Sequence, residues 1–442
     1  MLKSIALLSF FSILAAAQDT NARFEQIIQY YVSNHQFMGS VLVAKGDQTL
    51  LDRGYGSADL EWNVPNSPTG KFRLGSITKQ FTAACILLLE KRGKLNVQDP
   101  VKKYVPDAPP SWDKITIYHV LTHTSGVPNF TNFPDYRSSE AMATTPQQLL
   151  DRFKNKPLDF EPGTKWSYSN SGYVLLGYII EKVSGGSYQR FLQENIFNPL
   201  GMKDSGYDSN SAVILHRVSG YTRGPDGIEN AGYINMTVPF SAGGLYSTTE
   251  DLLRWHRGLF GGKVLSAASL QKMTTPFKNN YAMGLMVETH HGRRVISHGG
   301  GIEGFNTAAS YWPDDKLSVI VLANLNGQAP DEIANDLAAV VHGEQVTLPS
   351  ERKGTELSAE ALKPYVGVYE YQPGLNLTIT QDKGHLMAQL TGQPQLHIYP
   401  ESPTKFFWKE VDAQIEFTKD LSGKVTGATI HQGGHDLVLH RR

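Results

Sequence analysis

The feature that most restricts the fold is an apolar run that begins near Ala83 and reads "ACILLLE". The surrounding segment 78–92 has the length of a helix and stops before Gly93, a residue favoured just after a helix C-terminus. Because the middle of this segment lacks a polar face, such a helix is buried on nearly all sides. The sequence therefore predicts a central helix enclosed by the other elements of a sizeable domain.

The elements expected around this helix form an α+β pattern. Strands come early, helices fill the middle, and strands and a helix return late, which indicates a sheet built from both ends of the segment. The expected strands are 39–45, 48–55, 294–298, 305–312 and 317–324. The expected helices are 22–32, 117–121, 146–153 after the cap Thr145, 172–183, 188–196, one following the candidate cap Ser247, and 331–341.

The 442-residue chain is long enough for more than one domain. Residues 18–347 are predicted to form the α+β domain, and 348–358, polar with proline and glycine, a linker. Short alternating runs over 359–442, such as "LNLTIT" and "QIEFTK", predict a small all-β barrel or sandwich. The near-equal counts of 41 Lys and Arg against 42 Asp and Glu give no attraction to nucleic acid or to an anionic membrane surface.

The N-terminus has the pattern of an export signal. Lys3 precedes an apolar stretch, and small residues at 15–17 suit cleavage before Gln18. The stretch is shorter than the roughly 20 residues that span a bilayer, so residues 1–17 are predicted to be a signal peptide of a periplasmic or secreted protein. The single cysteine, Cys85, lies in the apolar run, which favours a core position.

The start of the central helix carries Ser76 and Lys79, three residues apart. This spacing alone does not identify a site, because it recurs at Ser111/Lys114, Ser269/Lys272, Ser350/Lys353 and Ser402/Lys405. The pair at 76/79 is distinguished by its position on one face of a buried helix, near an N-terminus whose free N–H groups favour an oxyanion. Serine becomes a nucleophile when a neighbour takes its proton, and a desolvated lysine can do so.

Two further segments supply what such a pair needs. A tyrosine can relay protons, and of two Tyr-x-Asn triplets only Tyr168 to Asn170 lies in a loop before a long helix. Backbone N–H donors are needed for the oxyanion, and "SHGGG", residues 297–301, follows a predicted strand with glycines that allow close approach of a substrate.

In this order and at these separations, Ser76-x-x-Lys79, Tyr168-x-Asn170 and His298-Gly-Gly300 resemble the serine β-lactamase and penicillin-binding-protein superfamily. The similarity is to the branch of class C β-lactamases, D-amino-acid peptidases and related esterases. It extends to "LTHTSGV", "YSNSGYVLLGYIIE" and "PLGM" and covers roughly residues 24–345. The terminal β-domain resembles, more weakly, the lipocalin-like modules appended to this branch. The implied fold is an antiparallel sheet flanked by helices, with a helical subdomain.

The resemblance implies a role for each motif residue. Ser76 would be acylated, Lys79 would be its base, and Tyr168 would relay protons. Asn170 would orient Lys79 and the substrate amide. The N–H groups of Ser76 and Gly301 would form the oxyanion hole. Gly300 would belong to the strand edge that binds the substrate, and His298 stands at the position where many relatives carry lysine.

Plainer structural interpretations stay open for several of these residues. Ser76 could be an ordinary helix-start residue, Tyr168 a packing residue and Asn170 the N-cap of the following helix. His298 and His123 could be structural. Trp166 either lines the site or packs.

No cofactor or metal is implied by the motifs. His119 and His123 are four residues apart but have no obvious third ligand.

The sequence narrows the substrate class without fixing it. At the strand motif, Gly299 offers no hydroxyl and a neutral His298 offers no permanent charge for the carboxylate of a β-lactam. The favoured function is an exported serine hydrolase acting on small-molecule esters or on D-amino-acid peptides. The alternatives are a β-lactamase and a catalytically inactive protein that binds peptidoglycan-like peptides.

Overall fold

The structure is a computed structural model that describes residues 20–224, 226–290, 292–432 and 435–442. The predicted signal segment 1–17 lies outside the described residues. The chain forms two compact units, one ending at residue 342 and one formed mainly by 343–442. The first unit thus ends before residue 347, the predicted end of the α+β domain. The predicted linker, 348–358, contains only the 3₁₀ turn Pro349–Glu351.

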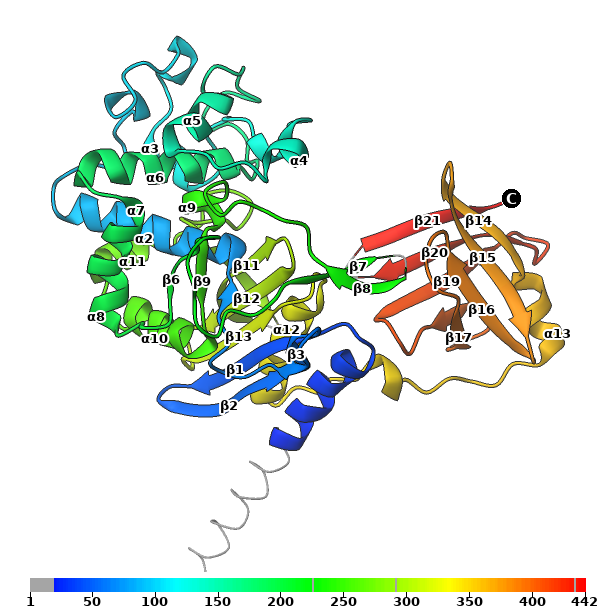
Figure 1. The fold of residues 1–442 in the computed structure, drawn as a ribbon. Helices are drawn as coiled ribbons and strands as arrows, with labels where there is room; N and C mark the ends of the chain where they lie inside the picture. Colours follow the sequence, from blue (N-terminus) through cyan, green and yellow to red (C-terminus); the bar gives the residue numbers. More distant parts are fainter. Residues whose placement is uncertain (1–19, 225, 291, 433–434) are drawn as a thin grey trace, which may run out of the picture. The chain divides into compact units, whose positions relative to one another are not determined.

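The first unit is built on a six-stranded antiparallel sheet (Figure 1). Its strands, in spatial order, are β10 (Met286–His290), β11 (Arg293–Ile302), β12 (Phe305–Trp312), β13 (Leu317–Ala323), β1 (Gly39–Lys45) and β2 (Gln48–Tyr55). Because β1 pairs with β13, from Gly39 opposite Ala323 to Lys45 opposite Leu317, the N-terminal hairpin joins the late meander in one sheet. The prediction of a sheet built from both ends of the segment is confirmed.

Short strands form smaller sheets around the main one. These are β3 (Ser57–Asp59) with β4 (Val64–Pro65), β7 (Tyr221–Gly224) with β8 (Gly227–Asn230), and β5 (Phe72–Arg73) with β9 (Leu245–Ser247) and β6 (Gly206–Tyr207). The pairing of β5 with β9 holds the chain just before Ser76.

The helices of the first unit cover the sheet and form the helical subdomain. They are residues 20–33, α2 (Thr78–Lys91), α3 (Ile117–Leu121), α4 (Tyr136–Ser139), α5 (Pro146–Lys154), α6 (Asn170–Ser184), α7 (Tyr188–Leu192), α8 (Asn198–Leu200), α9 (Phe240–Gly243), α10 (Thr249–Phe260), α11 (Ala267–Met273) and α12 (Ala329–Val341). A π-helical turn, Gln193–Phe197, joins α7 to α8.

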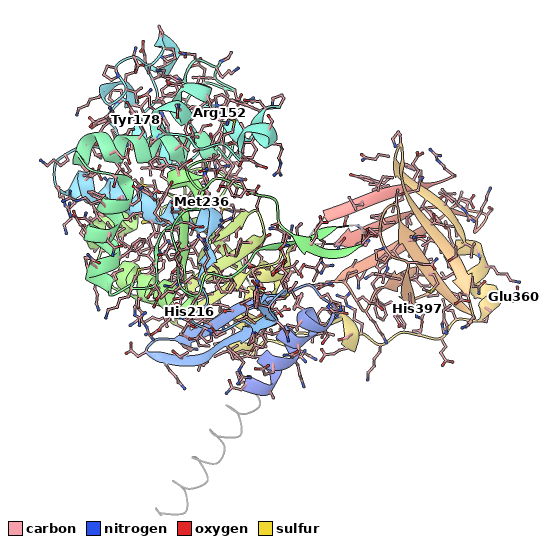
Figure 2. All side chains as sticks on the ribbon, viewed as in Figure 1. Arg152, Tyr178, His216, Met236, Glu360 and His397 are labelled. Atoms are coloured by element: carbon pink, nitrogen blue, oxygen red, sulfur yellow. The ribbon has the colours of Figure 1, made fainter. Side chains whose placement is uncertain are left out.

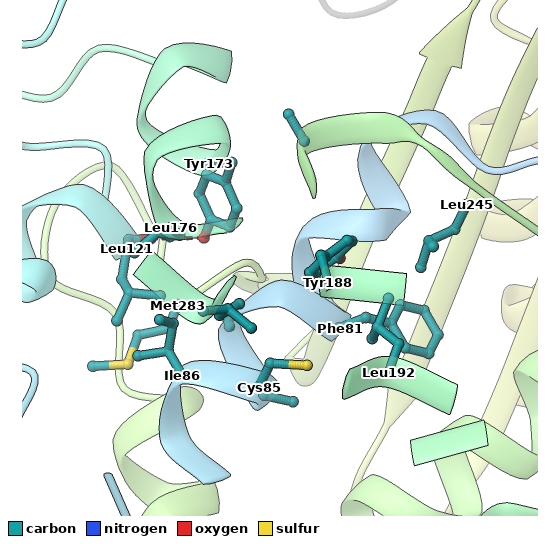
Figure 3. Packing of buried hydrophobic residues seen from close by; sticks show 14 of the residues in the cluster. Phe81, Cys85, Ile86, Leu121, Tyr173, Leu176, Tyr188, Leu192, Leu245 and Met283 are labelled. Atoms are coloured by element: carbon teal, nitrogen blue, oxygen red, sulfur yellow. Dashed lines mark hydrogen bonds between the residues drawn. The ribbon is translucent and has the colours of Figure 1, made fainter. Parts of the chain in front are cut away.

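The central helix α2 is buried along almost its whole length, as its apolar run predicts. Every residue from Thr78 to Leu89 is buried. Figure 3 shows Phe81, Cys85 and Ile86 of α2 packed among side chains from α3, α6, α7 and β9. Cys85 is free and buried, in agreement with the predicted core position.

Side-chain caps set the starts of α5 and α10. Thr145 caps α5 as predicted and forms a reciprocal capping box with Gln148. For α10 the predicted cap Ser247 is wrong, because Ser247 is the last residue of β9 and Thr248 accepts the N–H of Asp251. Across the helical subdomain, the Tyr178 hydroxyl of α6 donates to Gln147 Oε1 of α5, and Figure 2 labels Tyr178 among these helices.

The second unit is a closed barrel of eight antiparallel strands, in agreement with the predicted all-β domain. Its elements are α13 (Ala359–Leu362), β14 (Gly367–Gln372), β15 (Leu375–Asp382), β16 (His385–Leu390), β17 (Leu396–Pro400), β18 (Lys405–Phe407), β19 (Ala413–Lys419), β20 (Val425–Gln432) and β21 (His435–Arg441). Packed aromatic side chains, among them Tyr365, Phe406 and Phe417, belong to its hydrophobic core.

Candidate active site

Ser76 lies in a 3₁₀ turn, Gly75–Ile77, directly before α2. Gly75 has a φ of +53°, and a Cβ at this position would lie 2.8 Å from the backbone nitrogen of Gly301. Glycine is therefore required where the turn passes β11, both for its left-handed backbone and for the close approach. This turn brings the backbone of Ser76 next to the end of β11.

Lys79 follows on the first turn of α2 and points at Ser76. Its Nζ lies 3.0 Å from Ser76 Oγ, 2.8 Å from Asn170 Oδ1 and 2.9 Å from the carbonyl oxygen of Ala242. The side chain is completely buried, and burial lowers the pKa of Lys79 well below its usual value. The three contacts suit a neutral amine that donates to the two carbonyl-type oxygens and accepts the Ser76 proton.

Tyr168 approaches Ser76 from the loop before α6. The Ser76 hydroxyl hydrogen-bonds the phenol, and Lys79 Nζ lies 4.8 Å from the centre of the Tyr168 ring. Burial raises the pKa of Tyr168, and the hydrogen bond with Ser76 partly offsets this rise. The Tyr168 phenol is therefore protonated at neutral pH and can pass a proton to a leaving group.

Asn170 is the first residue of α6 and is not its N-cap. Ser169 is the N-cap, since its Oγ accepts the N–H of Gly172. The Asn170 side chain accepts from Lys79 and donates through Nδ2 to Thr131 Oγ1 at 3.2 Å. The amide is thus fixed with its oxygen toward the lysine, and the N-cap interpretation of Asn170 is wrong.

The glycines of β11 differ in their roles. A Cβ on Gly300 would come within 1.9 Å of the Leu74 carbonyl oxygen, whereas a Cβ on Gly299 would meet nothing closer than 3.5 Å. Gly300 is therefore needed for β11 to pass the Ser76 turn, and Gly299 is not. Gly301 lines the same cavity as Ser76, as the expected oxyanion hole requires.

His298 is held inside the protein on β11 and does not line the cavity beside Ser76. Its side chain is 6% exposed, Nε2 lies 3.1 Å from the hydroxyl of Tyr281, and Nδ1 lies 2.6 Å from the carbonyl oxygen of Gly299. The carbonyl can only accept, so Nδ1 carries the proton and Nε2 accepts from Tyr281. Burial and the neighbouring Lys79 lower the pKa of His298 to about 4, so it is neutral at physiological pH.

His123 supports the Tyr168 loop from behind. Its Nδ1 accepts the N–H of Ser169 at 3.2 Å, its carbonyl oxygen accepts the N–H of Ser167, and its ring lies 4.3 Å from the Tyr168 ring. Burial, Lys79 and His298 keep the pKa of His123 well below its usual value. His123 therefore positions the loop as a neutral group.

The sequence did not predict two contributors to the site. One is the Ala242 carbonyl oxygen of α9, which completes the contacts of Lys79. The other is Tyr281, which holds His298 and packs 4.6 Å from the His123 ring. Neither belongs to a motif with a recognisable spacing, so no sequence signal identifies them.

The cavity next to Ser76 has a volume of about 210 Å³. Its wall is about equally polar and apolar, and Glu303 is the acidic side chain that lines it. Glu303 is paired with the exposed Arg137 at 3.1 Å. The full lining is Gly75, Ser76, Phe130, Thr131, Tyr136, Asn170, Ile234, Pro239, Ala242, Gly243, Gly301, Ile302 and Glu303.

The described residues contain no group of three or more side chains that could ligate a metal ion. His119, which with His123 has the four-residue spacing of a possible metal-ligand pair, accepts the N–H of Thr116 in the capping box of α3. Within the described part of the chain, no helix has the length and hydrophobicity needed to cross a bilayer.

The site thus combines a serine with a buried lysine one helical turn away. A tyrosine and an asparagine reach this pair from the helical subdomain, and a glycine-rich strand of the antiparallel sheet passes beside it. This arrangement is that of the β-lactamase and penicillin-binding-protein class. The β-lactamase family model matches residues 24–344. The chain belongs to this family, whose members include hydrolases. A second model, a domain of unknown function (DUF3471), matches residues 351–441.

Individual relatives agree with this assignment. Penicillin-binding protein 4* of Bacillus subtilis (strain 168) is 30% identical over 430 residues, which cover 91% of this chain and 94% of the relative. The octameric penicillin-binding protein homologue from Pyrococcus abyssi superposes with a TM-score of 0.69 at 25% identity, covering 95% of this chain and 98% of that one. A D-stereospecific amidohydrolase from Streptomyces sp. gives 0.63 at 26%, covering 74% and 99%.

Proposed function

We propose that this protein is a serine hydrolase that forms an acyl-enzyme on Ser76 and cleaves small esters or amides. Ser76 Oγ attacks the substrate carbonyl carbon while its proton passes to Lys79 Nζ. The electron pair of the C=O bond moves onto oxygen, where the N–H groups of Ser76 and Gly301 stabilise the negative charge. When the tetrahedral intermediate collapses, the bond to the leaving group breaks, and Lys79 and Tyr168 supply the departing group with the proton.

The second half of the reaction repeats these steps with water. Water gives a proton to the Lys79 and Tyr168 pair and adds to the acyl carbonyl. The bond to Ser76 Oγ then breaks, and the oxygen recovers its proton, which releases the acid and restores the enzyme.

The observation that carries this proposal is the 3.0 Å contact between Ser76 Oγ and Lys79 Nζ, with Lys79 completely buried. The other hydrogen-bond partners of Lys79 Nζ are the uncharged oxygens of Asn170 and Ala242. A structural lysine in such a place would need a carboxylate to hold its charge. An amine that is neutral for part of the time needs none, and it can accept the serine proton.

The cavity favours small, weakly polar acyl groups and disfavours anionic ones next to the scissile bond. Glu303 faces the space beside Ser76, and the neutral His298 provides no cation for a carboxylate. These features support an esterase or an amidase for D-amino-acid derivatives over a dedicated β-lactamase. The similarity to a D-stereospecific amidohydrolase points in the same direction.

The experiment compares three proteins on p-nitrophenyl butyrate and on the p-nitroanilides of D- and L-alanine. Wild type should hydrolyse the ester and prefer the D-anilide, and Ser76→Ala should lose more than about 1,000-fold in kcat/KM. The control is Ser111→Ala, an exposed serine in the same Ser-x-x-Lys spacing, which should behave as wild type. Hydrolysis that survives in Ser76→Ala would reject Ser76 as the nucleophile, and an inactive wild type would favour a binding protein.

We also propose export to the periplasm or the medium. The proposal is supported by the charged, apolar and small-residue pattern of residues 1–17. N-terminal sequencing of protein from the extracytoplasmic fraction should begin at Gln18. Full-length protein confined to the cytoplasm would contradict it.

A further inference from the structure

A second cavity, of about 710 Å³, opens next to the one at Ser76. The two cavities share Ile234 and Glu303 in their walls. The larger cavity is lined by Arg73, Asn210, Ser211, Ala212, Val213, Ile214, Arg217, Val218, Ser219, Gly220, Asn230, Ala231, Gly232, Tyr233, Ile234, Glu303 and Phe305. The two spaces therefore adjoin at Ile234 and Glu303.

Two guanidinium groups in the wall of the larger cavity are fixed by one buried carboxylate. Arg73 Nε donates to Asp208 Oδ2 at 2.8 Å, and Arg217 Nη1 donates to Asp208 Oδ1 at 2.9 Å. The Asp208 side chain is fully buried, whereas the Arg73 and Arg217 side chains are 17% and 29% exposed. One carboxylate cannot neutralise two guanidiniums, so this cluster keeps a net charge of +1.

The geometry leaves donors available to a ligand. Asp208 takes only Nε of Arg73, so among the described residues both terminal nitrogens of that guanidinium remain for another acceptor. Arg217 uses Nη1 for Asp208 and for the carbonyl oxygen of Ser209, which leaves Nε and Nη2. Planar forks held in place in this way bind carboxylate oxygens with little loss of side-chain freedom.

The neighbouring charges determine how far from the reacting bond an anion can sit. Glu303 at the shared wall repels an anion close to Ser76, although Arg137 partly compensates it. Arg73 precedes Ser76 by three residues, so their Cα atoms are at most about 11 Å apart. An anionic group is thus repelled directly beside the scissile carbonyl and attracted to the arginines of the larger cavity.

We propose that the cavity at Arg73 and Arg217 is a subsite for a carboxylate carried by the substrate at some distance from the scissile bond. This inference rests on the proposed acyl transfer at Ser76 and defines its substrate class further. It assigns a binding role to an ion-pair cluster that the reaction itself does not use.

The test measures kcat/KM for matched pairs of substrates that differ only in one charge. One series consists of mono-p-nitrophenyl esters of dicarboxylic acids from adipate to sebacate, each compared with its ω-carboxamide. The other consists of D-alanine amides of ω-amino acids, again with their carboxamides, to learn whether the acyl or the leaving side enters the subsite. In one series the carboxylate should be preferred by about 10- to 100-fold at an intermediate length, the range expected for charge-assisted hydrogen bonds.

Variants connect this preference to the cluster. The measured quantity is the ratio of kcat/KM for the carboxylate substrate to kcat/KM for its carboxamide. Arg217→Gln should reduce this ratio to about one, and Arg217→Lys should keep part of the preference. Both variants should hydrolyse neutral p-nitrophenyl butyrate as wild type does. Arg190→Gln, the same change on an exposed arginine of α7 paired with Glu194, is the control and should leave the ratio unchanged.

Two results would overturn the subsite. One is a ratio near one at every length in both series of the wild type, a measurement that needs no variant and so does not depend on the folding of Arg217→Gln. The other is a preference that persists in folded Arg217→Gln. Failure of wild type on p-nitrophenyl butyrate would instead contradict the proposed hydrolase function, so the two failures are distinguishable.

Discussion

Replacing Lys79 by methionine tests the base at the centre of the site. Methionine keeps the length and the apolar stem of lysine but removes the amine that lies 3.0 Å from Ser76 Oγ. General-base catalysis contributes about 100- to 10,000-fold, and no other described side chain of the site has both the position and the lowered pKa of Lys79. We therefore expect kcat/KM for p-nitrophenyl butyrate to fall by about 1,000-fold, which corresponds to roughly 4 kcal/mol.

The same substitution has a predictable effect on stability. The oxygens of Asn170 and Ala242 each lose a donor, at a cost of about 1–3 kcal/mol for each group left unpaired. Against this, the variant no longer buries an amine. Because the pKa of Lys79 is lowered in the folded state, the unfolded chain binds more protons between that pKa and about 10.4. In this window wild type gains stability as the pH rises, and Lys79→Met does not.

The assay combines ester hydrolysis at neutral pH with urea unfolding at neutral and alkaline pH. Lys91→Met, on the exposed end of α2, is the matched control and should change neither measurement substantially. A Lys79→Met protein that keeps more than about a tenth of wild-type kcat/KM would refute the lysine base. A stability difference from wild type that does not change with pH would refute the lowered pKa.

Three further predictions concern the strand side of the site. Tyr281→Phe removes the donor to His298 Nε2 and should lower kcat by about 10-fold. Tyr311→Phe, the same change on β12, is the control and should not lower kcat. Equal effects of the two changes would contradict the role of Tyr281 in positioning His298. Gly300→Ala should abolish ester hydrolysis and lower the melting temperature, whereas Gly299→Ala should do neither, since a Cβ would clash with the Leu74 carbonyl oxygen at 1.9 Å in the former and meet nothing closer than 3.5 Å in the latter. Because the pKa of His298 is lowered to about 4, its neutral folded form contributes stability that is lost as the pH falls from about 6.5 to 4. His298→Gln should therefore show a shallower loss in acid urea unfolding than wild type, and parallel curves would contradict this.

The sequence predicted the parts of the candidate site that depend on short stretches of the chain. The apolar run after Lys79 identified a buried helix, and its position selected Ser76 and Lys79 from five pairs of equal spacing. The strands Gly39–Lys45 and Phe305–Trp312 agree with their predicted bounds because alternation and flanking turns mark them clearly. The convergence of Tyr168 and Asn170 on Lys79 followed from family resemblance, since spacing alone does not place them together.

Other features depend on contacts that a linear pattern does not contain. Tyr281 and the cluster of Arg73, Asp208 and Arg217 come from loops and short strands brought together only in the folded chain. The cap of α10 was misplaced by one residue because Ser247 and Thr248 are both good caps, and the pairing of Ser247 with Phe72 in the small sheet decides between them. Local propensity could not make that choice.

The most direct test of the central claim is to locate the covalent adduct that the protein forms with a fluorophosphonate. Intact-mass spectrometry followed by peptide mapping should show one adduct, on Ser76, that is absent in Ser76→Ala and slowed in Lys79→Met. An adduct on another residue, or unchanged labelling of Ser76→Ala, would contradict the account.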